Sequence, residues 1–581
     1  MSRYHWLIRH VLLFSILICC AVLSAKANEQ SWPQTRAERT DYKETSHYSD
    51  VIDFLESLQS KGAPIDVQFI GTSPEGRRIP MVIAGRPVPA GPAQARRLRR
   101  PIVCVQANIH AGEVEGKEAV LMMLRNLARG QHGKLLDKIV LIVLPIYNID
   151  GNEKLGPQSR TRSNQFGPEM VGIRANGQGL DLNRDYVRLA APETRAALQH
   201  VFTTWDPDVF MDLHATNGTL HGYQLTYSPP LNPDTESGIL AYTRDELLLA
   251  VRRDIRRDYG FEIMDYGNVP RRNTADRPFA WYTNAPQARY GTNYMGMRNR
   301  ISILSEAMSH CSFKVRTKAT YRFVQLILEK VAQDSTRVIE LTRKADLNMT
   351  SRGLHPDTAP ALGIRFEFAS RGRERVLLDK SQVPQLRKTQ SSRRKPGPPK
   401  NVIEVEMEIY DRLKVTVTRP YPAAYILSPD LSGIAQLLVT HGVVVEKTMK
   451  PLKTTVQSLH VTGVELRKGW SLPYALREVT GTYTTKETIQ PVGSYVVRTG
   501  QPLGVLIFNL LEPEGLDGVG AWNLLGDRLK VGEPYPITKS FKQIRVPSEK
   551  VLESTAGSWL PMNADESGAV ATIIKQSFID E

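Results

Sequence analysis

Four side chains that can bind a metal or move a proton follow apolar segments of this chain. His110 and Glu113 stand three residues apart in "QANIHAGEVEGKEAV", directly after the apolar run "PIVCVQA". His214 follows "PDVFMDL", and Glu306 follows "RISILS". A His-x-x-Glu pair alone also fits a polar turn, and a single histidine or glutamate is more often structural. Three apolar segments that each end in such a group favour one shared site, because open α/β sheets bind their ligands at strand ends.

Together these residues have the composition of a hydrolytic zinc centre. Zinc in hydrolases is typically held by three protein ligands, with a fourth position open for water. His110, Glu113 and His214 supply two imidazoles and one carboxylate. Glu306 can then take the proton from the water that the metal activates. The sequence does not decide between zinc and another divalent metal.

A second polar cluster has the residue types that bind a carboxylate. The stretch "GQGLDLNRDYVRLAAPET" contains Asp181, Asn183 and Arg184 just before a helix expected to begin at Pro192. Arginine binds a carboxylate with two parallel hydrogen bonds, and Asn183 can add an amide donor. Asp181 can orient a ligating histidine through its second ring nitrogen. In isolation, the cluster is equally consistent with a capped loop that carries an exposed arginine.

The elements around these residues predict an α/β domain. Near-continuous apolar runs are typical of strands that are covered on both faces, so we expect a mixed, largely parallel sheet flanked by helices. The segment "VQFIGTSPEGRRIPMVIAG" is expected to form a hairpin. Helical periodicity predicts helices over 46–61, 115–129, 192–204, 235–258 and 315–347, and strands are expected at "PIVCVQA", "KIVLIVLPIYN", "PDVFMDL" and "RISILS".

With 581 residues, the chain is too long for one ordinary core. We expect a signal peptide over 1–27, a catalytic domain over 28–348, and a β-rich C-terminal domain without evident chemistry over 349–581. Past residue 350 helical periodicity fades, and "NVIEVEMEIY" and "RLKVTVTRP" alternate like exposed antiparallel strands. The stretch "PDLSGIAQLLVTHGVVVEK" predicts a small helix followed by a strand, and the basic Pro/Gly-rich segment 387–400 predicts a flexible loop.

The first 27 residues have the features of an export signal. Arg3 and Arg9 precede the apolar segment "VLLFSILICCAVLSA", which ends in Ala25-Lys26-Ala27. An uncleaved anchor is the alternative, but the run is short for a membrane span. No later stretch is long and apolar enough to cross a bilayer. We therefore expect a periplasmic or secreted protein with no transmembrane span after cleavage.

Charge and cysteine content limit the classes of partner. The net charge is +15, of which the signal segment carries +3, and basic residues gather in "RPVPAGPAQARRLRRP" and "RKTQSSRRKPGPPK". Such loops could touch anionic envelope surfaces, but no nucleic-acid recognition motif accompanies them. After loss of Cys19 and Cys20, only Cys104 and Cys311 remain. Cys104 is expected to be an inert core thiol, and pairing of the two stays open.

Residues 45–345 resemble the zinc carboxypeptidases, the carboxypeptidase A-like metallopeptidases. The resemblance is carried by "GTSPEGRRIP", "HAGEVEGKEA", "LDLNRDY", the histidine after "FMDL" and the glutamate after "ISILS", in that order. The inserts "PVPAGPAQARRLRR" and "GPQSRTRSNQFGPEMVGIRANGQG" depart from the digestive members, so the chain looks like a divergent bacterial-type branch with an extra C-terminal domain. The segment "LLEPEGLDGVGAWN" resembles a domain of that branch, with no role implied.

The resemblance implies a role for each site residue. One zinc ion would be bound by His110, Glu113 and His214, with Glu306 as the catalytic base. Asn183 and Arg184 would bind the terminal carboxylate of the substrate, and Asp181 would hold His110 from behind. An arginine that polarises the scissile carbonyl is expected upstream, and a tyrosine that covers the substrate is expected before Glu306. For the arginine we favour Arg162 over Arg160 and Arg174, and for the tyrosine we name Tyr290, with Tyr282 and Tyr294 also eligible.

The function implied is that of a zinc metallocarboxypeptidase that removes C-terminal residues from peptides with a free terminal carboxylate. An alternative on the same fold is an N-acyl amino-acid deacylase or other amidohydrolase with the same zinc set. A non-catalytic peptide-binding protein is disfavoured, because it predicts a lost ligand or base and all four positions are present. The preferred side chain and the oligomeric state stay open.

Overall fold

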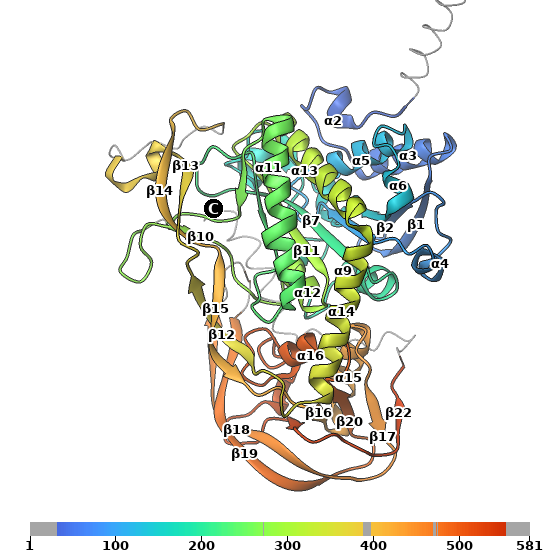
Figure 1. Cartoon of the computed structure of the whole chain (residues 1–581), viewed down its shortest axis with the longest axis vertical. Helices are drawn as coiled ribbons and strands as arrows, with labels where there is room; N and C mark the ends of the chain where they lie inside the picture. The colour runs from blue at the N-terminus through green and yellow to red at the C-terminus, as the bar shows by residue number, and fades with distance from the viewer. Residues whose placement is uncertain (1–31, 271, 387–396, 469–471, 473–474, 553–581) are drawn as a thin grey trace, which may run out of the picture.

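A computed structural model describes residues 32–270, 272–386, 397–468, 472 and 475–552 (Figure 1). The expected signal peptide lies outside these residues, as does most of the segment 387–400. Across the part of the chain that is described, no helix is long and apolar enough to cross a membrane.

The first half of the chain is built on one eight-stranded sheet, in the order β1-β2-β4-β3-β7-β11-β8-β9. The central strands β4, β3, β7 and β11 run parallel to one another. At one side of them, β2 pairs antiparallel with β4, and β1 pairs antiparallel with β2. At the other side, β8 pairs antiparallel with β11. The expected mixed, largely parallel sheet is confirmed, and the apolar runs are its buried strands. The strands are β1 Ile65–Thr72, β2 Arg78–Ala84, β3 Ile102–Ala107, β4 Val140–Leu144, β7 Val209–Thr216, β8 Leu225–Ser228, β9 Ile263–Asp265 and β11 Ile301–Met308.

Helices cover this sheet largely where periodicity predicts them. The expected helix 315–347 is, however, two helices, because the backbone of Asp334 leaves helical geometry between them and its side chain accepts a hydrogen bond from Tyr242. The expected helices 192–204 and 235–258 each contain a π-helical stretch. The helices are α3 Tyr48–Ser60, α5 Glu115–Ala128, α9 Pro192–Ala197, α10 Ser237–Ala241, α11 Leu248–Tyr259, α12 Gly291–Met297, α13 Phe313–Gln333 and α14 Ser335–Leu354.

The C-terminal region is β-rich, as expected. A seven-stranded antiparallel sheet in the order β19-β18-β21-β16-β20-β17-β22 carries the helices α15 Ser432–Thr440 and α16 Gly504–Leu511. Figure 1 shows α14 reaching from the upper body toward this lower one, where it contacts α16. The sheet's strands are β16 Ala424–Leu427, β17 Glu446–Thr448, β18 Leu452–Lys468, β19 Ala475–Gln490, β20 Tyr495–Arg498, β21 Ile537–Ser540 and β22 Ser548–Lys550.

Smaller sheets connect the two halves. The predicted strands "NVIEVEMEIY" and "RLKVTVTRP" form, but they pair with preceding strands rather than with each other. One of them also pairs with β10 of the first half, so the halves share backbone hydrogen bonds. Because α14 continues past residue 348, the division there stays a prediction. The strands are β10 Trp281–Tyr282, β12 Leu362–Ala369, β13 Arg373–Asp379, β14 Val402–Tyr410 and β15 Arg412–Arg419.

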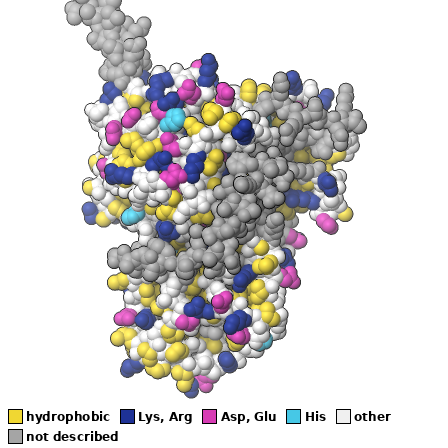
Figure 2. Space-filling view, turned by 180° about the vertical axis from the view of Figure 1, so that it is seen from behind, with side chains coloured by type: hydrophobic (Ala, Val, Ile, Leu, Met, Phe, Trp, Pro, Cys, Tyr) yellow, Lys and Arg dark blue, Asp and Glu magenta, His cyan; other side chains and the backbone are white. Residues whose placement is uncertain are grey.

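Both remaining cysteines lie in the interior of the protein. Cys104 and Cys311 are both buried and are not bonded to each other, and burial raises the pKa of both thiols. The predicted place of Cys104 in the core is confirmed, and a buried thiol with a raised pKa is little ionised at neutral pH. On the face shown in Figure 2, acidic and basic side chains are interspersed, and no broad single-sign patch is visible between the grey regions.

Glu193 at the start of α9 should make stability depend on pH. Asn176 donates to its carboxylate, yet burial raises its pKa to about 7, so the folded state favours the protonated form. That stabilisation is complete below the unfolded pKa and is lost as pH rises through 7. We expect Glu193→Gln to raise the melting temperature at pH 8 but hardly at pH 5, with up to about 3 kcal/mol gained. Melting curves across this range test it, with exposed Glu56→Gln as control; parallel curves for Glu193→Gln and wild type would contradict it.

Candidate metal centre

The predicted ligands and base come from three adjacent parallel strands. β7 lies between β3 and β11, and in the register of β7 with β11, His214 stands directly opposite Glu306. The last rung between β3 and β7 pairs Ala107 with Leu213, one residue before His214. His214 and Glu306 therefore lie within their strands, two residues before the last one, rather than after them as the sequence analysis expected. His110 and Glu113 follow β3 in the loop to α5.

The sharp turn of this loop is not made by one of its glycines. Asn108, not a glycine, adopts the left-handed conformation that turns the chain, with φ of 64°. Neither Gly112 nor Gly116 has a positive φ in this range. A Cβ on Gly112 would lie 2.7 Å from Cδ of Arg162, and one on Gly116 would lie 2.9 Å from Cβ of Leu213. Both glycines are thus needed for close packing rather than for the turn.

Three ligand atoms converge between the strands and the loop. One atom each from His110, Glu113 and His214 lies within 4.8 Å of the others, and all three residues are buried. Nδ1 of His110 lies 3.1 Å from one oxygen of Glu113, and Nδ1 of His214 lies 2.9 Å from the other. Both imidazoles therefore present the same nitrogen to one point, beside a carboxylate. Two imidazoles and a carboxylate in a buried, convergent set fit Zn²⁺.

Each histidine is held from behind by an aspartate. Nε2 of His110 lies 3.0 Å from Asp181, and Nε2 of His214 lies 2.9 Å from Asp212. Such carboxylates fix the ring orientation of metal-binding histidines and raise their basicity. Asp181 therefore occupies the position proposed for it. Asp212 was missed, although its spacing was a usable signal: residues two apart on a strand face the same side of the sheet.

Glu306 has an oxygen available for chemistry. Its Oε2 is buried and has no hydrogen-bond partner in the described part of the structure. Burial raises the pKa of this carboxyl to about 8, opposed by the charge of His214 and reinforced by that of Glu113. A cation at the neighbouring ligands would favour the ionised form, which is the one that can accept a proton. A carboxylate with one buried, unbonded oxygen beside a ligand set is consistent with a general base.

Two of the three candidate arginines reach the ligand set. Arg162 donates to Glu113 at 3.0 Å and to the backbone oxygen of Ala215 at 2.8 Å. Arg174 bonds Asp181 at 2.8 Å and lies 3.6 Å from Glu113, but its side chain is 42% exposed against 12% for Arg162. Arg160 is exposed on the short helix that precedes Arg162. The geometry favours Arg162 and leaves Arg174 as a second cation at the site.

The carboxylate cluster lies against the ligands. Nδ2 of Asn183 lies 3.3 Å from Nε2 of His214. The guanidinium of Arg184 is 4.6 Å from the ring of Tyr290, and its buried Nε has no hydrogen-bond partner among the residues described. Of the other tyrosines, Tyr282 stacks on Tyr410 away from this cluster, and Tyr294 is fully buried and bonded to His441. Tyr290 is therefore the candidate that contacts Arg184.

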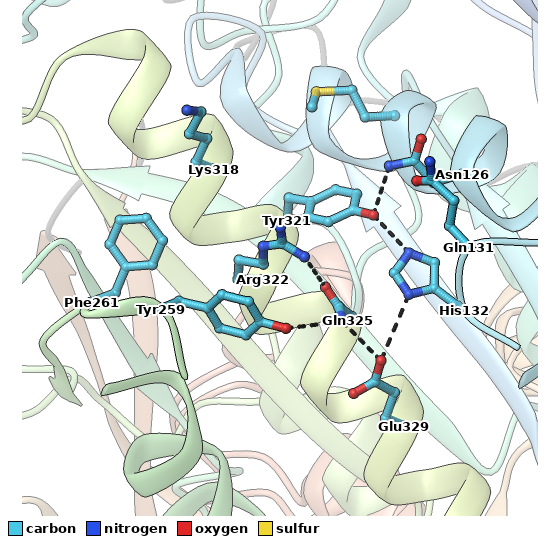
Figure 3. Close-up of a pocket in the computed structure, with 11 residues that line it drawn as sticks. Asn126, Gln131, His132, Tyr259, Phe261, Lys318, Tyr321, Arg322, Gln325 and Glu329 are labelled. Atoms are coloured by element: carbon cyan, nitrogen blue, oxygen red, sulfur yellow. Dashed lines mark hydrogen bonds and ion pairs between the residues drawn. The ribbon is translucent and has the colours of Figure 1, made fainter. Parts of the chain in front are cut away.

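A cavity of about 630 Å³ lies elsewhere, between the ends of α5 and α11 and the outer face of α13 (Figure 3). None of the predicted site residues lines it. Its polar groups bond to one another: Asn126 donates to the Tyr321 hydroxyl, which also contacts His132, and Arg322 donates to Gln325. These polar side chains of the cavity are therefore engaged with one another, and the candidate metal ligands lie elsewhere, on the central sheet.

A family match decides the assignment. The family model described as Zinc carboxypeptidase matches residues 51–294. This part of the chain belongs to the zinc carboxypeptidase family. The match includes His110, Glu113 and His214 and ends before Glu306. Membership in a zinc-dependent family of peptidases implies a metal-dependent hydrolase.

Curated relatives extend the similarity beyond this domain. The chain is 24% identical to Carboxypeptidase 2 of Trichophyton equinum and of Trichophyton rubrum over 481 residues, which covers 80% of this chain and 81% of each relative. Coverage of that extent must reach well into the C-terminal region. Both relatives come from Trichophyton species, so the expected bacterial-type branch stays a prediction.

Solved structures show weaker similarity. A metallo-carboxypeptidase from Burkholderia cenocepacia is 17% identical, with a TM-score of 0.35 over 49% of this chain and 69% of that one. Carboxypeptidase A from Helicoverpa armigera is 15% identical, with a TM-score of 0.36 over 51% of this chain and 75% of that one. At these scores the structures add no support to the assignment, which rests on the sequence match.

Asp212 is expected to matter for metal affinity, although it is not itself one of the three proposed ligands. Asp212→Asn removes the carboxylate behind His214 and should weaken zinc binding about 10- to 100-fold, as loss of such partners does. Competition with a chromogenic chelator measures the affinity. Asp254→Asn, a buried carboxylate on α11 remote from the ligands, serves as control. Unchanged affinity in Asp212→Asn would show that the strand holds His214 without it.

Proposed function

We propose that this protein is a zinc metallocarboxypeptidase that hydrolyses the C-terminal peptide bond of peptides with a free terminal carboxylate. The observation that carries the proposal is the contact between Asn183 and His214, which puts the carboxylate cluster beside the metal ligands. A terminal carboxylate bound by Asn183 and Arg184 would leave only the last peptide bond within reach of the ligands. This geometry supports an exopeptidase rather than an endopeptidase.

His110, Glu113 and His214 would hold one zinc ion, since their buried donor atoms converge and both histidines are backed by aspartates. Bound there, the ion would supply Lewis acidity that lowers the pKa of water and polarises the scissile carbonyl. The protein's own contribution is to exclude other ligands and fix the three donors. Arg162, which bonds Glu113, also brings a cation to the edge of the site where the carbonyl oxygen would gain charge.

Glu306 is proposed as the general base. Among the residues described, Oε2 of Glu306 accepts no hydrogen bond. On the adjacent strand, Glu306 stands opposite the proposed ligand His214. A proton taken from the attacking water could then pass to the amine that leaves, as the same carboxyl changes from base to acid. Asn183, Arg184 and Tyr290 would hold the terminal carboxylate and the last residue in place during both steps.

Export and the three-part division of the chain are part of the same proposal. The signal-like segment 1–27 supports a protein that acts outside the cytoplasm, and the strand-rich region after residue 348 supports a separate C-terminal unit. Amino-terminal sequencing of protein recovered from outside the producing cell tests cleavage after Ala27. An intact amino terminus would contradict the signal assignment.

Glu306→Gln should remove the base and leave the ligands intact. We expect kcat to fall at least about 10³-fold, because proton transfer and charge stabilisation are both lost, while zinc content stays at wild-type level. Hydrolysis kinetics combined with elemental analysis of the metal measure this. Exposed Glu56→Gln is the matched control. Full activity in Glu306→Gln would disprove the base assignment.

The carboxylate requirement is tested with paired substrates. Peptides with a free C-terminus should be cut at least about 100-fold better than the same peptides with a C-terminal amide, because Arg184 would lose a charged partner. Chelation of the metal should abolish both reactions, and zinc should restore them. Equal rates on the two series would exclude the clamp. Preference for acylated amino acids over peptides would favour the deacylase instead.

A further inference from the structure

We infer that the C-terminal region positions the group that binds the substrate carboxylate. This group, the carboxylate clamp, consists of Asn183, Arg184 and Tyr290. The region bonds to the two segments that carry the clamp: Asp517 bonds to the residue just before Tyr290, and His441 bonds to the loop that carries Asn183 and Arg184. The inference rests on the proposed function of the clamp and extends it to residues far away in the sequence.

Asp517 makes the first contact, with the residue just before Tyr290. Its carboxylate accepts from the backbone N–H of Arg289 at 2.6 Å and forms an ion pair with the Arg289 guanidinium at 3.1 Å. Trp522 donates its indole N–H to the same carboxylate at 2.7 Å. Asp517, Trp522 and Arg289 are each at most 6% exposed. A buried pair of this kind fixes geometry strongly, because breaking it leaves an unpaired charge in the interior.

The two residues after Arg289 connect it to the clamp. Tyr290 caps α12, and its ring lies 4.6 Å from the Arg184 guanidinium. The next residue, Gly291, donates its backbone N–H to Oδ1 of Asn183 at 3.0 Å. The other end of the same amide, Nδ2, lies 3.3 Å from Nε2 of His214, behind the ligating nitrogen of that ring. Two of the three clamp residues are therefore bonded or stacked against a segment that Asp517 holds.

His441 makes the second contact, at the end of α15. Its Nε2 lies 3.1 Å from the backbone oxygen of Val187, and its Nδ1 lies 2.8 Å from the Tyr294 hydroxyl. A carbonyl only accepts, so Nε2 carries the hydrogen, and burial lowers the pKa of His441 to about 3, which leaves Nδ1 as an acceptor for Tyr294. One neutral imidazole thus joins α12 to the loop that contains Asn183 and Arg184.

The glycines near Asp517 lie in close contact with neighbouring backbone and side-chain atoms. In "LLEPEGLDGVGAWN", a Cβ on Gly518 would lie 2.6 Å from the backbone oxygen of Leu510, and one on Gly520 would lie 2.7 Å from the Tyr535 hydroxyl. α16, which leads into this segment, packs against α12. The cavity between the segment and residues 286–288 holds about 20 Å³, room for roughly one water. The two halves are therefore in close contact at this point.

Kinetics of Asp517→Asn test the inference. Loss of the charge should displace Arg289 and the clamp, so we expect KM for free peptides to rise about 10- to 100-fold, with a smaller change in kcat and unchanged zinc content. Glu514→Gln is the matched control, because Glu514 lies in the same segment but pairs with Arg419 of the C-terminal region. It should leave KM unchanged. An unchanged KM in Asp517→Asn, or an equal rise in Glu514→Gln, overturns the positioning role.

A double-mutant cycle separates positioning from general instability. In an Arg184→Ala background, Asp517→Asn should raise KM no further, because the clamp through which it acts is already lost. Independent, additive effects would overturn the inference. Trp522→Phe removes the indole donor and part of the buried ring but keeps both charges of the Asp517–Arg289 pair. It is the second variant if Asp517→Asn does not fold, and it should raise KM in the same direction. The wild-type protein is first compared on free and amidated peptides. If it shows no preference for the free peptides, the proposed function is overturned. If it shows that preference but the variants keep the wild-type KM, this inference alone is overturned.

Discussion

Parallel hydrogen bonding of β7 to β3 and β11 decides where chemistry can occur in this protein. Parallel strands in register bring equivalent positions side by side, so His214 and Glu306 stand opposite each other and the loop after β3 turns His110 and Glu113 toward them. Buried apolar residues on these strands leave no freedom to slip, since a shift of one residue would turn every side chain to the opposite face. The ligand set is therefore a consequence of strand register.

The charged residues that surround the candidate ligands control which carboxylates are ionised. Although burial opposes ionisation, Arg174, Arg184 and His110 hold the pKa of Asp181 well below its usual value. For Glu113, His110 and Arg162 overcome burial in the same way and lower the pKa. Oε2 of Glu306 has no hydrogen-bond partner among the residues described, and burial raises the pKa of this carboxyl. One site thus keeps two carboxylates ionised as ligand and support while a third can exchange a proton, which is the division of roles that hydrolysis needs.

None of the proposed site residues lies in the C-terminal region, yet this region is bonded to the first half of the chain. β10 pairs with β14, α14 contacts α16, and Asp517 and His441 reach the segments on either side of the clamp. Similarity to Carboxypeptidase 2 of Trichophyton equinum also extends over both halves of the chain. A substrate clamp held from outside its own sheet would depend on both halves of the chain for its geometry.

The amino-acid sequence alone determined the sheet, most of its helices and the ligand set, because these follow from short-range patterns: apolar runs for buried strands, helical periodicity, and polar groups where the runs end. It did not determine the roles of Asp212, Gly112 or Asp517. The role of Asp212 depends on its contact with the ring of His214, and that of Gly112 on the Arg162 side chain packed against it. Asp517 lies more than 200 residues from its partner Arg289. Such contacts join segments that only tertiary packing brings together, and no local pattern records which partner a buried charge will find.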